Sequence, residues 1–417
     1  MSAPDLEAAA PTVAIGGRAR LIPVADGLVT AVAVSLPWST SATSILIVLW
    51  YLALLPTLDV AMLRREVLSA AGGLPVMLWV LGVVGMLWAD VSWAERLAGL
   101  SGFHKLLLIP LLLAQFRRSG QAKWAFVGFL ASTAVLLVVS WAYILVPDLS
   151  PPRRPPGVPV KDYVFQSAIF ATSAFGLLAL IAEPGRAPAR IGLALALAAF
   201  VADIFYVATG RTTLVVLAVL LLLFGLRQFG WKGALGAMLA GSMLAGAAWE
   251  SSPYLRKRVS QVVEEVRSFE NADVHSPVGL RLEYWRKSSG FIAEAPILGH
   301  GTGAIPKLFL RGTTADTDPQ LPTDNPHNQV LAVMLQIGLP GTAVLLAMWV
   351  AHLMLFRGRT LVAWFGLVVV VQNIVGSLFN SYLFDFSQGW LYVVGVGVAG
   401  GVVLHGTSRA AGAEGKA

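Results

Sequence analysis

The sequence predicts an all-α protein that crosses a membrane many times. Of its 417 residues, 56% are hydrophobic and only 13% are charged, and the mean hydropathy is +0.72. These values are too apolar and too charge-poor for a soluble chain of this length. Apolar runs of membrane-spanning length also recur from end to end, and one long polar insertion, roughly residues 251–327, interrupts them.

We expect about twelve membrane-spanning helices from the lengths of these runs. They lie near residues 24–38, 41–58, 74–89, 102–115, 122–146, 163–182, 190–208, 212–226, 232–250, 328–356, 360–379 and 388–406. The chain accordingly divides into three parts. Residues 1–250 hold an N-terminal tail and the helices before the insertion, residues 251–327 form a helical loop, and residues 328–417 hold the remaining helices and a C-terminal tail.

Basic residues in the short loops predict the orientation. Arginine and lysine gather in the loops of one side, which the positive-inside rule assigns to the cytoplasm. These residues are Arg64, Arg65, Arg117, Arg118, Lys123, Arg186, Arg190, Arg227, Lys232, Arg357 and Arg359. The insertion therefore faces outward, and both termini face the cytoplasm.

Composition also excludes several classes of protein. The net charge of +7 follows from this topology and does not indicate a nucleic-acid-binding surface. Because the chain has no cysteine, disulfides, thiolate metal sites and cysteine nucleophiles are excluded. Residues 1–20 lack a charged region followed by a cleavable apolar segment, so we expect a cytosolic tail and not a signal peptide.

The insertion is predicted to contain two helices. Apolar residues at three- and four-residue steps indicate an amphipathic helix that lies on the membrane or caps the bundle, and they are Leu255, Val259, Val262, Val263, Val266 and Phe269. A second helix is expected from about residue 279 to 294, and it carries Arg281. The glycine-rich segment 299–303 that follows is typical of a tight turn and is only a weak phosphate-loop signal.

The segment Asp324-Asn325-Pro326-His327-Asn328 closes the insertion and opens the next membrane helix. Asp324 or Asn325 can act as N-cap, and Pro326 suits the first helical position. His327 would then lie in the first turn, where the positive end of the helix dipole disfavours the imidazolium. A neutral histidine at this boundary can act as a general base, and a hydrated helix-start histidine is the other interpretation.

Two arginines on the same outer side are candidates for anion binding. Arg211 begins an apolar helix directly after Thr209-Gly210. Its guanidinium can anchor the helix at the membrane interface, or it can bind phosphate oxygens together with the helix N-terminus. Arg281 is ambiguous alone, because an arginine on an amphipathic helix usually belongs to a solvated face.

Two patterns together resemble the O-antigen ligase family, within the wider group of O-antigen ligases and polymerases. The first is HN-x9-G-x2-G, which runs from His327 to Gly341. The second is GLR…W…PILGHG, which runs from Gly279 to Gly301. The resemblance is strong over roughly residues 205–345 and rests on topology elsewhere. The polymerase branch of the group shares the same architecture.

This resemblance implies a GT-C-type glycosyltransferase fold and a metal-independent, inverting glycosyl transfer without a cofactor. An O-antigen glycan would move from undecaprenyl diphosphate to a sugar hydroxyl of lipid A–core oligosaccharide, at the periplasmic face of the Gram-negative inner membrane. By analogy His327 is the catalytic base, Arg211 and Arg281 bind the donor diphosphate, and His300 and Asn328 support the site. The implied partners are these two substrates and membrane lipids, with no nucleic acid, and we expect a monomer or a weak oligomer.

Other interpretations remain to be weighed against this one. An O-antigen polymerase and a protein O-oligosaccharyltransferase belong to the same group. Asp316-Thr317-Asp318 has the spacing of a divalent-ion motif, although a solvated turn is the simpler interpretation. His275, His300 and His327 lack the spacing of a zinc site. A transporter would require paired intramembrane charges, whereas Asp203 has no acidic partner.

Asp385 is a further candidate in the last outer loop, within Phe384-Asp385-Phe386. Its carboxylate could orient His327 or contact the acceptor. The alternative is that it caps the helix that follows.

Overall fold

The protein is all-helical in the computed structural model, which describes residues 13–414 apart from residues 153, 185, 271–275 and 312–322. Before the insertion the α-helices are α1 (Val13–Ser35), α2 (Thr40–Leu54), α3 (Val60–Val67), α4 (Ala70–Gly85), α5 (Trp93–His104), α6 (Leu108–Phe116), α7 (Ala122–Leu145), α8 (Tyr163–Ala182), α9 (Ala187–Tyr206) and α10 (Arg211–Ser251). From the insertion onward they are α11 (Pro253–Glu270), α12 (Pro277–Glu294), α13 (Ile305–Leu310), α14 (Gln329–Leu355), α15 (Leu361–Ser377) and α16 (Phe386–Glu414). Short 3-10 turns are η1 (Leu55–Thr57), η2 (Lys105–Leu107) and η3 (Pro147–Leu149).

The helices are those of a multi-pass membrane protein. Among the described residues, eight helices are long and apolar enough to cross a membrane, or nine if the bent pair α3 and α4 forms one span. α15 is apolar but shorter, with 17 residues. The apolar segments expected from the sequence fall on these helices, except for segment 24–38, which falls mainly on α1. The expected number of about twelve spans stays a prediction.

α10 consists of two arms that fold back on each other. Gly230, with φ of 65° and ψ of −155°, breaks the helix with a conformation that glycine adopts readily. A Cβ atom on Gly225 would lie 2.4 Å from the carbonyl oxygen of Gly233, and one on Gly241 would lie 2.8 Å from the Leu221 side chain. Glycine therefore allows close contact between the two arms, which correspond to the expected segments 212–226 and 232–250.

α14 also doubles back, where the sequence suggested one continuous helix over 328–356. The backbone leaves helical geometry at Ile337 and at Gly338, which has φ of 60°. The Thr342 hydroxyl lies 3.1 Å from the carbonyl oxygen of Gly338 and 3.2 Å from the Met334 sulfur. In a straight helix, residues eight apart would be separated by about 12 Å. The first arm, before Gly338, therefore folds beside the start of the second.

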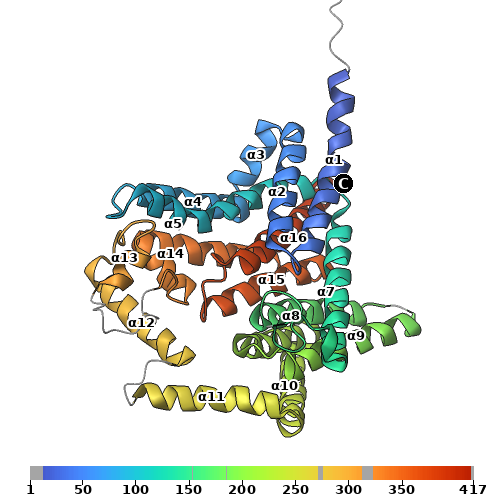
Figure 1. Cartoon of the computed structure of the whole chain (residues 1–417). Coiled ribbons are helices and arrows are strands. Elements are labelled where there is room, and N and C mark those ends of the chain that lie inside the picture. The colour runs from blue at the N-terminus through green and yellow to red at the C-terminus, as the bar shows by residue number, and fades with distance from the viewer. Residues whose placement is uncertain (1–12, 153, 185, 271–275, 312–322, 415–417) are drawn as a thin grey trace, which may run out of the picture.

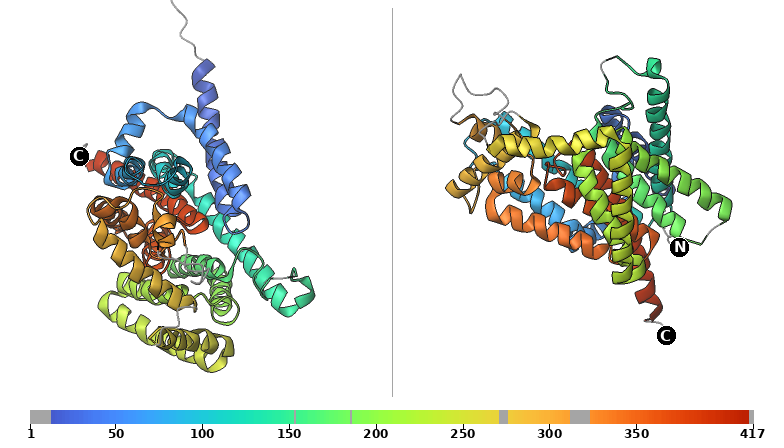
Figure 2. Two further views of the ribbon diagram at one scale, coloured as in Figure 1. Left: turned by 60° about the vertical axis from the view of Figure 1, so that its left-hand side comes forward. Right: turned by 90° about the horizontal axis from the view of Figure 1, so that it is seen from below.

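The two arms of α14 have different neighbours. The second arm packs along α4, and the His352 Nε2–H donates to the Ala71 carbonyl at 2.9 Å near its end. The first arm joins α12 and α13 in a small apolar core of Tyr284, Ala304, Ile305, Leu308, Phe309, Ala332 and Leu335. α12 and α13 thus hold the first arm. α11 extends from α10 along the lower edge of Figure 1 toward the side of the molecule where α12 lies. Figure 2 shows α11 from two further directions, again reaching α10.

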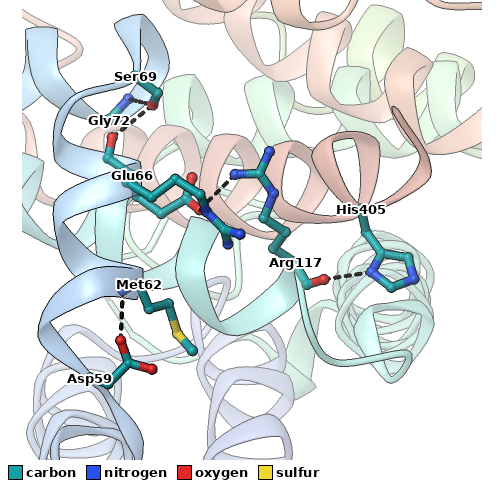
Figure 3. A network of polar contacts seen from close by, with 8 residues as sticks. Asp59, Met62, Glu66, Ser69, Gly72, Arg117 and His405 are labelled. Carbon is teal, nitrogen blue, oxygen red and sulfur yellow. Dashed lines mark hydrogen bonds and ion pairs between the residues drawn. The ribbon is translucent and has the colours of Figure 1, made fainter. Parts of the chain in front are cut away.

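A polar network lies where α3, the start of α4 and the end of α6 meet (Figure 3). The Glu66 carboxylate is fully buried and accepts hydrogen bonds from Arg65 and Arg117, both at 2.8 Å. Arg118 donates to the Thr57 carbonyl at 2.7 Å, and the His405 Nδ1–H donates to the Arg117 carbonyl at 2.6 Å. These arginines belong to the loops that the sequence assigns to the cytoplasm.

Candidate functional site

The segment Asn325 to Asn328 turns the chain into α14. Asn325 Oδ1 accepts a hydrogen bond from the His327 N–H at 2.8 Å, which closes a turn around Pro326. His327 takes a φ of 53°, a left-handed value that is uncommon outside glycine. Asn328 then caps α14, because its side chain accepts the N–H groups two and three residues later at 2.9 and 3.2 Å.

This geometry corrects the helix start predicted from the sequence. Asp324 or Asn325 was expected to be the N-cap, with His327 in the first turn. Instead the cap is Asn328 and the helix begins at Gln329. The Asn325 side chain serves the preceding turn, so His327 lies just outside the helix in its own strained conformation.

The His327 ring is half-buried between a tyrosine and an amide. It stacks on Tyr284 with ring centroids 5.8 Å apart and planes inclined by 13°. Its Nδ1 lies 3.1 Å from Asn380 Oδ1. Tyr284 is held in turn by the edge of Phe309, with centroids 5.6 Å apart. α12 and the loop before α16 therefore both position the ring.

The surroundings of His327 keep the ring neutral. Burial lowers its pKa below the ordinary 6.5, and the positive charge of Arg281 lowers that pKa further. The hydrogen bond to Asn380 and the charge of Asp324 oppose the shift but do not reverse it. The direction agrees with the sequence prediction, but the causes are burial and a neighbouring cation, whereas the sequence argument used the helix dipole.

Arg211, at the first position of α10, is paired with a carboxylate of the insertion. Its guanidinium donates two hydrogen bonds to Glu265 of α11, at 2.9 and 2.7 Å. Glu265 also accepts the Val278 N–H at 3.0 Å, at the start of α12. The hydrogen bond from Arg211 is the largest of the effects that lower the pKa of Glu265, so this carboxylate is ionised. Arg211 is thus an arginine that already binds a planar anion in two-pronged geometry.

Arg281, on α12, lies in electrostatic range of both other candidates. Burial lowers its pKa most, and the charge of Arg211 lowers that pKa further. The charge of Arg281 in turn lowers the pKa of His327. Arg281 also lies one helical turn before Tyr284, the ring on which His327 stacks. The structure therefore brings Arg211, Arg281 and His327 into one region.

Asp385 lies in the same loop as Asn380 but acts as a helix cap. Its carboxylate accepts the Gln388 N–H at 2.8 Å at the start of α16. The group that hydrogen-bonds the His327 ring is the Asn380 amide. The orienting role considered for Asp385 is therefore taken by a residue five positions earlier.

His300 belongs to a tight turn that packs on the break in α14. The His300 N–H donates to the Leu335 carbonyl at 2.8 Å, and its Nε2–H donates to the Phe291 carbonyl at 2.7 Å. Gly301 has a φ of 92°, and a Cβ there would lie 2.3 Å from the backbone of Ala89. The glycines of this segment thus allow close backbone packing, and the His300 ring fixes the end of α12.

Sequence reasoning missed two side chains that hold the site together. Asn380 is 53 residues from His327, and no local pattern links them. Glu265 lies on the polar face of an amphipathic helix, 54 residues from Arg211. For Asn325 the Asn-Pro pair was a usable signal, because asparagine side chains commonly close such turns.

Two cavities lie in this part of the molecule. A cavity of about 380 Å³ with a mixed polar and apolar lining contains Asn325 and Asn380, together with Glu95, Asp324, Gln336 and Asp385. A larger apolar cavity of about 580 Å³ lies between α8, α9, α10 and α11, and its lining begins at Leu214, one turn after Arg211. On α10 the lining of this apolar cavity begins three residues after Arg211 and extends along the helix bundle.

Metal ligands do not cluster in the described part of the chain. No group of three or more histidine, aspartate or glutamate side chains there could hold a metal ion. Asp316, Asp318 and His275, which the sequence raised as metal candidates, lie outside the described residues.

The fold and the site together define a polytopic membrane protein with a cationic, histidine-containing site between its membrane helices and one large helical loop. The family model for O-antigen ligase matches residues 193–346, a range that includes Arg211, Arg281 and His327. This match covers less than half of the chain, and it supports an O-antigen ligase/polymerase-group protein with a function of that general type. No curated protein matches it.

Proposed function

We propose that the protein is an O-antigen ligase of the Gram-negative inner membrane, with its active site on the periplasmic face. It transfers O-antigen glycan from undecaprenyl diphosphate to a sugar hydroxyl of lipid A–core oligosaccharide. The reaction inverts the anomeric carbon and requires no metal ion. His327 is the general base, and Arg211 and Arg281 bind the donor diphosphate.

The donor side of this proposal is supported by the two arginines. A diphosphate leaves readily once its charge is compensated, and two guanidinium groups supply this compensation through charge-assisted hydrogen bonds. Arg211 already holds the Glu265 carboxylate in two-pronged geometry, which is the geometry a phosphate would use. The donor would displace Glu265 from Arg211, and its polyprenyl chain would enter the apolar cavity that begins at Leu214.

The acceptor side is supported by the neutral state of His327. A sugar hydroxyl is a poor nucleophile until its proton is removed, and a positioned base contributes about 10²–10⁴-fold. The hydroxyl oxygen forms a bond to the anomeric carbon on the face opposite the diphosphate. The bond to the diphosphate breaks, the diphosphate leaves with the electron pair, and the proton moves to His327.

One observation carries the proposal: α12, which holds Arg281, contacts both parts of the site. Its Val278 N–H donates to the Glu265 carboxylate that pairs with Arg211, and its Tyr284 ring stacks on His327. Arg281 links the position proposed for the leaving group to the position proposed for the base. Glycosyl transfer requires these two functions on opposite faces of one sugar ring, so the base and the anion site must belong to one region.

Reconstitution tests this proposal. Purified protein in proteoliposomes is given lipid-linked glycan and rough lipopolysaccharide in EDTA, and extension of each acceptor is measured. We expect extension of lipid A–core, and loss of transfer in His327→Ala, Arg211→Ala and Arg281→Ala at normal protein level. Arg286→Ala is the matched control, because Arg286 lies on the same helix and is 69% exposed.

Other outcomes assign other functions. Extension of a second lipid-linked repeat would identify a polymerase, and extension of a protein acceptor would identify a protein O-oligosaccharyltransferase. Unchanged function in His327→Ala and Arg211→Ala would exclude this enzyme mechanism and would favour the transporter interpretation. Loss of transfer in EDTA would contradict the metal-independent reaction.

A further inference from the structure

The oxygen of the Asn380 side chain receives three hydrogen bonds. The Ser381 N–H lies 2.9 Å from Asn380 Oδ1, the Asn325 Nδ2 lies at 2.9 Å, and the His327 Nδ1 lies at 3.1 Å. All three contacts converge on one atom. The protonation of the histidine ring can therefore be decided from the chemistry of that atom.

Backbone donors fix the orientation of both amides. A backbone N–H can only donate, so the Asn380 atom that faces the Ser381 N–H must be the carbonyl oxygen. The same reasoning applies to Asn325, whose Oδ1 accepts the His327 N–H at 2.8 Å. Its other terminal atom is then the NH₂ group, which donates to Asn380. If either amide were flipped, its NH₂ group would face a backbone N–H, and neither group could accept a hydrogen bond.

The partner of the His327 ring is therefore an acceptor. An amide oxygen offers no hydrogen, so the ring nitrogen facing it must carry one. In a neutral imidazole, one nitrogen is a donor and the other holds a lone pair. A hydrogen on Nδ1 leaves the lone pair on Nε2.

We infer that Asn380 is a positioning residue that holds neutral His327 in the tautomer with hydrogen on Nδ1, so that Nε2 is the atom that accepts the proton of the attacking hydroxyl. For the neutral ring, the tautomer follows from the hydrogen bonds. Its use in catalysis rests on the proposed function, because that is what makes His327 the base.

The loop that carries Asn380 is itself held in place. Gln329 Oε1, at the start of α14, accepts the N–H groups of Leu383 and Phe384 at 3.0 and 3.2 Å. The buried Lys105 ammonium donates to the carbonyls of Phe384 and Asp385 at 3.1 and 2.7 Å. The loop is thereby tied to both α14 and η2. A partner that orients a catalytic ring must be fixed in this way, since a mobile amide would not select one tautomer.

An amide in this position has a different consequence from a carboxylate. A carboxylate would stabilise the imidazolium and raise the proton affinity of the ring, whereas a neutral amide orients the ring with little added charge stabilisation. Next to Arg281, the amide thus leaves His327 neutral while its geometry is fixed. Asn380 thus orients the His327 ring with little stabilisation of its protonated form.

Nitrogen-15 NMR of the histidine rings tests the tautomer directly. The full-length protein, labelled with ¹⁵N-histidine, is examined in lipid bilayers at neutral pH, because protonated and unprotonated ring nitrogens have well-separated shifts. The chain has six histidines, and the His327 signals are assigned as those missing from His327→Asn. We expect Nδ1 protonated and Nε2 unprotonated. An Nε2–H ring in the wild-type protein would overturn the inference.

Two substitutions separate positioning from general stability. Asn380→Leu removes the acceptor, so the Nδ1–H signal should be lost and kcat should fall about 10–100-fold, as is typical for partners that orient a functional ring. Asn380→Asp keeps an acceptor, so the Nδ1–H should remain while the acid limb of the pH–rate profile moves to higher pH. Retention of the Nδ1–H signal in Asn380→Leu would contradict the assigned role.

Asn373→Leu is the matched control. Asn373 is a buried amide on α15, and neither of its side-chain polar atoms has a hydrogen-bond partner in the described part of the chain. The His327 signals and kcat should be unchanged by this substitution. Full transfer activity in His327→Ala would overturn the proposed function whatever the NMR shows, whereas an Nε2–H ring together with an inactive His327→Ala would overturn the inference alone.

Discussion

The two ends of α14 each present a histidine, and the two histidines are used differently. His352, near the end, is fully buried with both ring nitrogens engaged: Nε2–H donates to the Ala71 carbonyl at 2.9 Å, and Nδ1 accepts from the Tyr392 hydroxyl at 2.5 Å. His327, just before the start of α14, is half-buried. Of its two ring nitrogens, only Nδ1 has a hydrogen-bond partner in the described part of the chain. A structural histidine uses both nitrogens, and a base must keep one for its substrate.

Loss of His327 should therefore lower activity, whereas loss of His352 should lower stability. The loss of activity in the His327 variant is the largest effect that we expect. His327→Ala should lower the rate of transfer by about 10²–10⁴-fold with normal protein level. His352→Leu should instead lower the free energy of unfolding by about 1–3 kcal/mol, because it leaves a buried carbonyl and a buried hydroxyl without partners. Proteoliposome transfer assays and thermal unfolding in detergent measure the two effects. Equal loss of activity per folded molecule in both variants would contradict a catalytic role for His327 and a structural role for His352.

The arginines near His327 should make the next largest contribution. Arg211→Ala and Arg281→Ala should each weaken the handling of the donor diphosphate by about 10–100-fold in kcat/KM, since each removes a charge-assisted contact. Arg286→Ala, on the same helix as Arg281, should leave kcat/KM within about 2-fold. The assay varies the lipid-linked donor at fixed acceptor. An effect of Arg286→Ala as large as that of Arg281→Ala would argue against a local anion site.

Glu265 should oppose donor binding, because it occupies Arg211 in the absence of substrate. Glu265→Gln keeps an acceptor for the Val278 N–H but removes the charge that competes with the diphosphate. We expect a KM for the donor that is about 2–5-fold lower, in line with the modest strength of partly exposed ion pairs. A higher KM would show that the ion pair chiefly holds the insertion in its binding position.

The pH dependence should show the smallest effect. His327 has a lowered pKa, so its neutral, basic form persists as pH falls and is lost only through a midpoint below 6.5. Arg281→Gln removes the cation that helps to lower this pKa, so the midpoint should move to higher pH. Titration of the His327 ¹⁵N signals follows the shift even if the variant is slow. An unchanged midpoint in Arg281→Gln would show that the charge of Arg281 does not lower the pKa of His327.

Much of the helical architecture could be predicted from the sequence because apolar runs and glycine breaks are local signals. Segments 212–226 and 232–250 were separated at the position where Gly230 turns the chain. The fold-back at Gly338 was missed, because the apolar pattern continues across it. That turn depends on contacts with the distant segment around Ile297, whose carbonyl accepts the Leu339 N–H at 3.1 Å.

The candidate site divides in the same way. His327, Arg211 and Arg281 could be selected from the sequence, since each stands at a helix boundary or within a recognisable pattern. Their neighbours could not: Asn380 and Glu265 come from segments more than fifty residues away and are placed by tertiary packing. The N-cap of α14 is Asn328 and not Asp324 or Asn325, because the Asn325 side chain closes the preceding turn. Local sequence patterns could therefore identify candidate residues, but the side chains that contact them could be found only from the tertiary structure.

Single-turnover transfer by His327→Ala, with donor binding measured separately, tests whether His327 is the general base. The protein in proteoliposomes is saturated with lipid-linked glycan in EDTA, mixed with rough lipopolysaccharide, and sampled for extended lipid A–core. We expect donor affinity close to that of the wild type and a transfer step slower by about 10²-fold or more. Transfer at the wild-type rate, or a defect confined to donor binding, would contradict this role of His327.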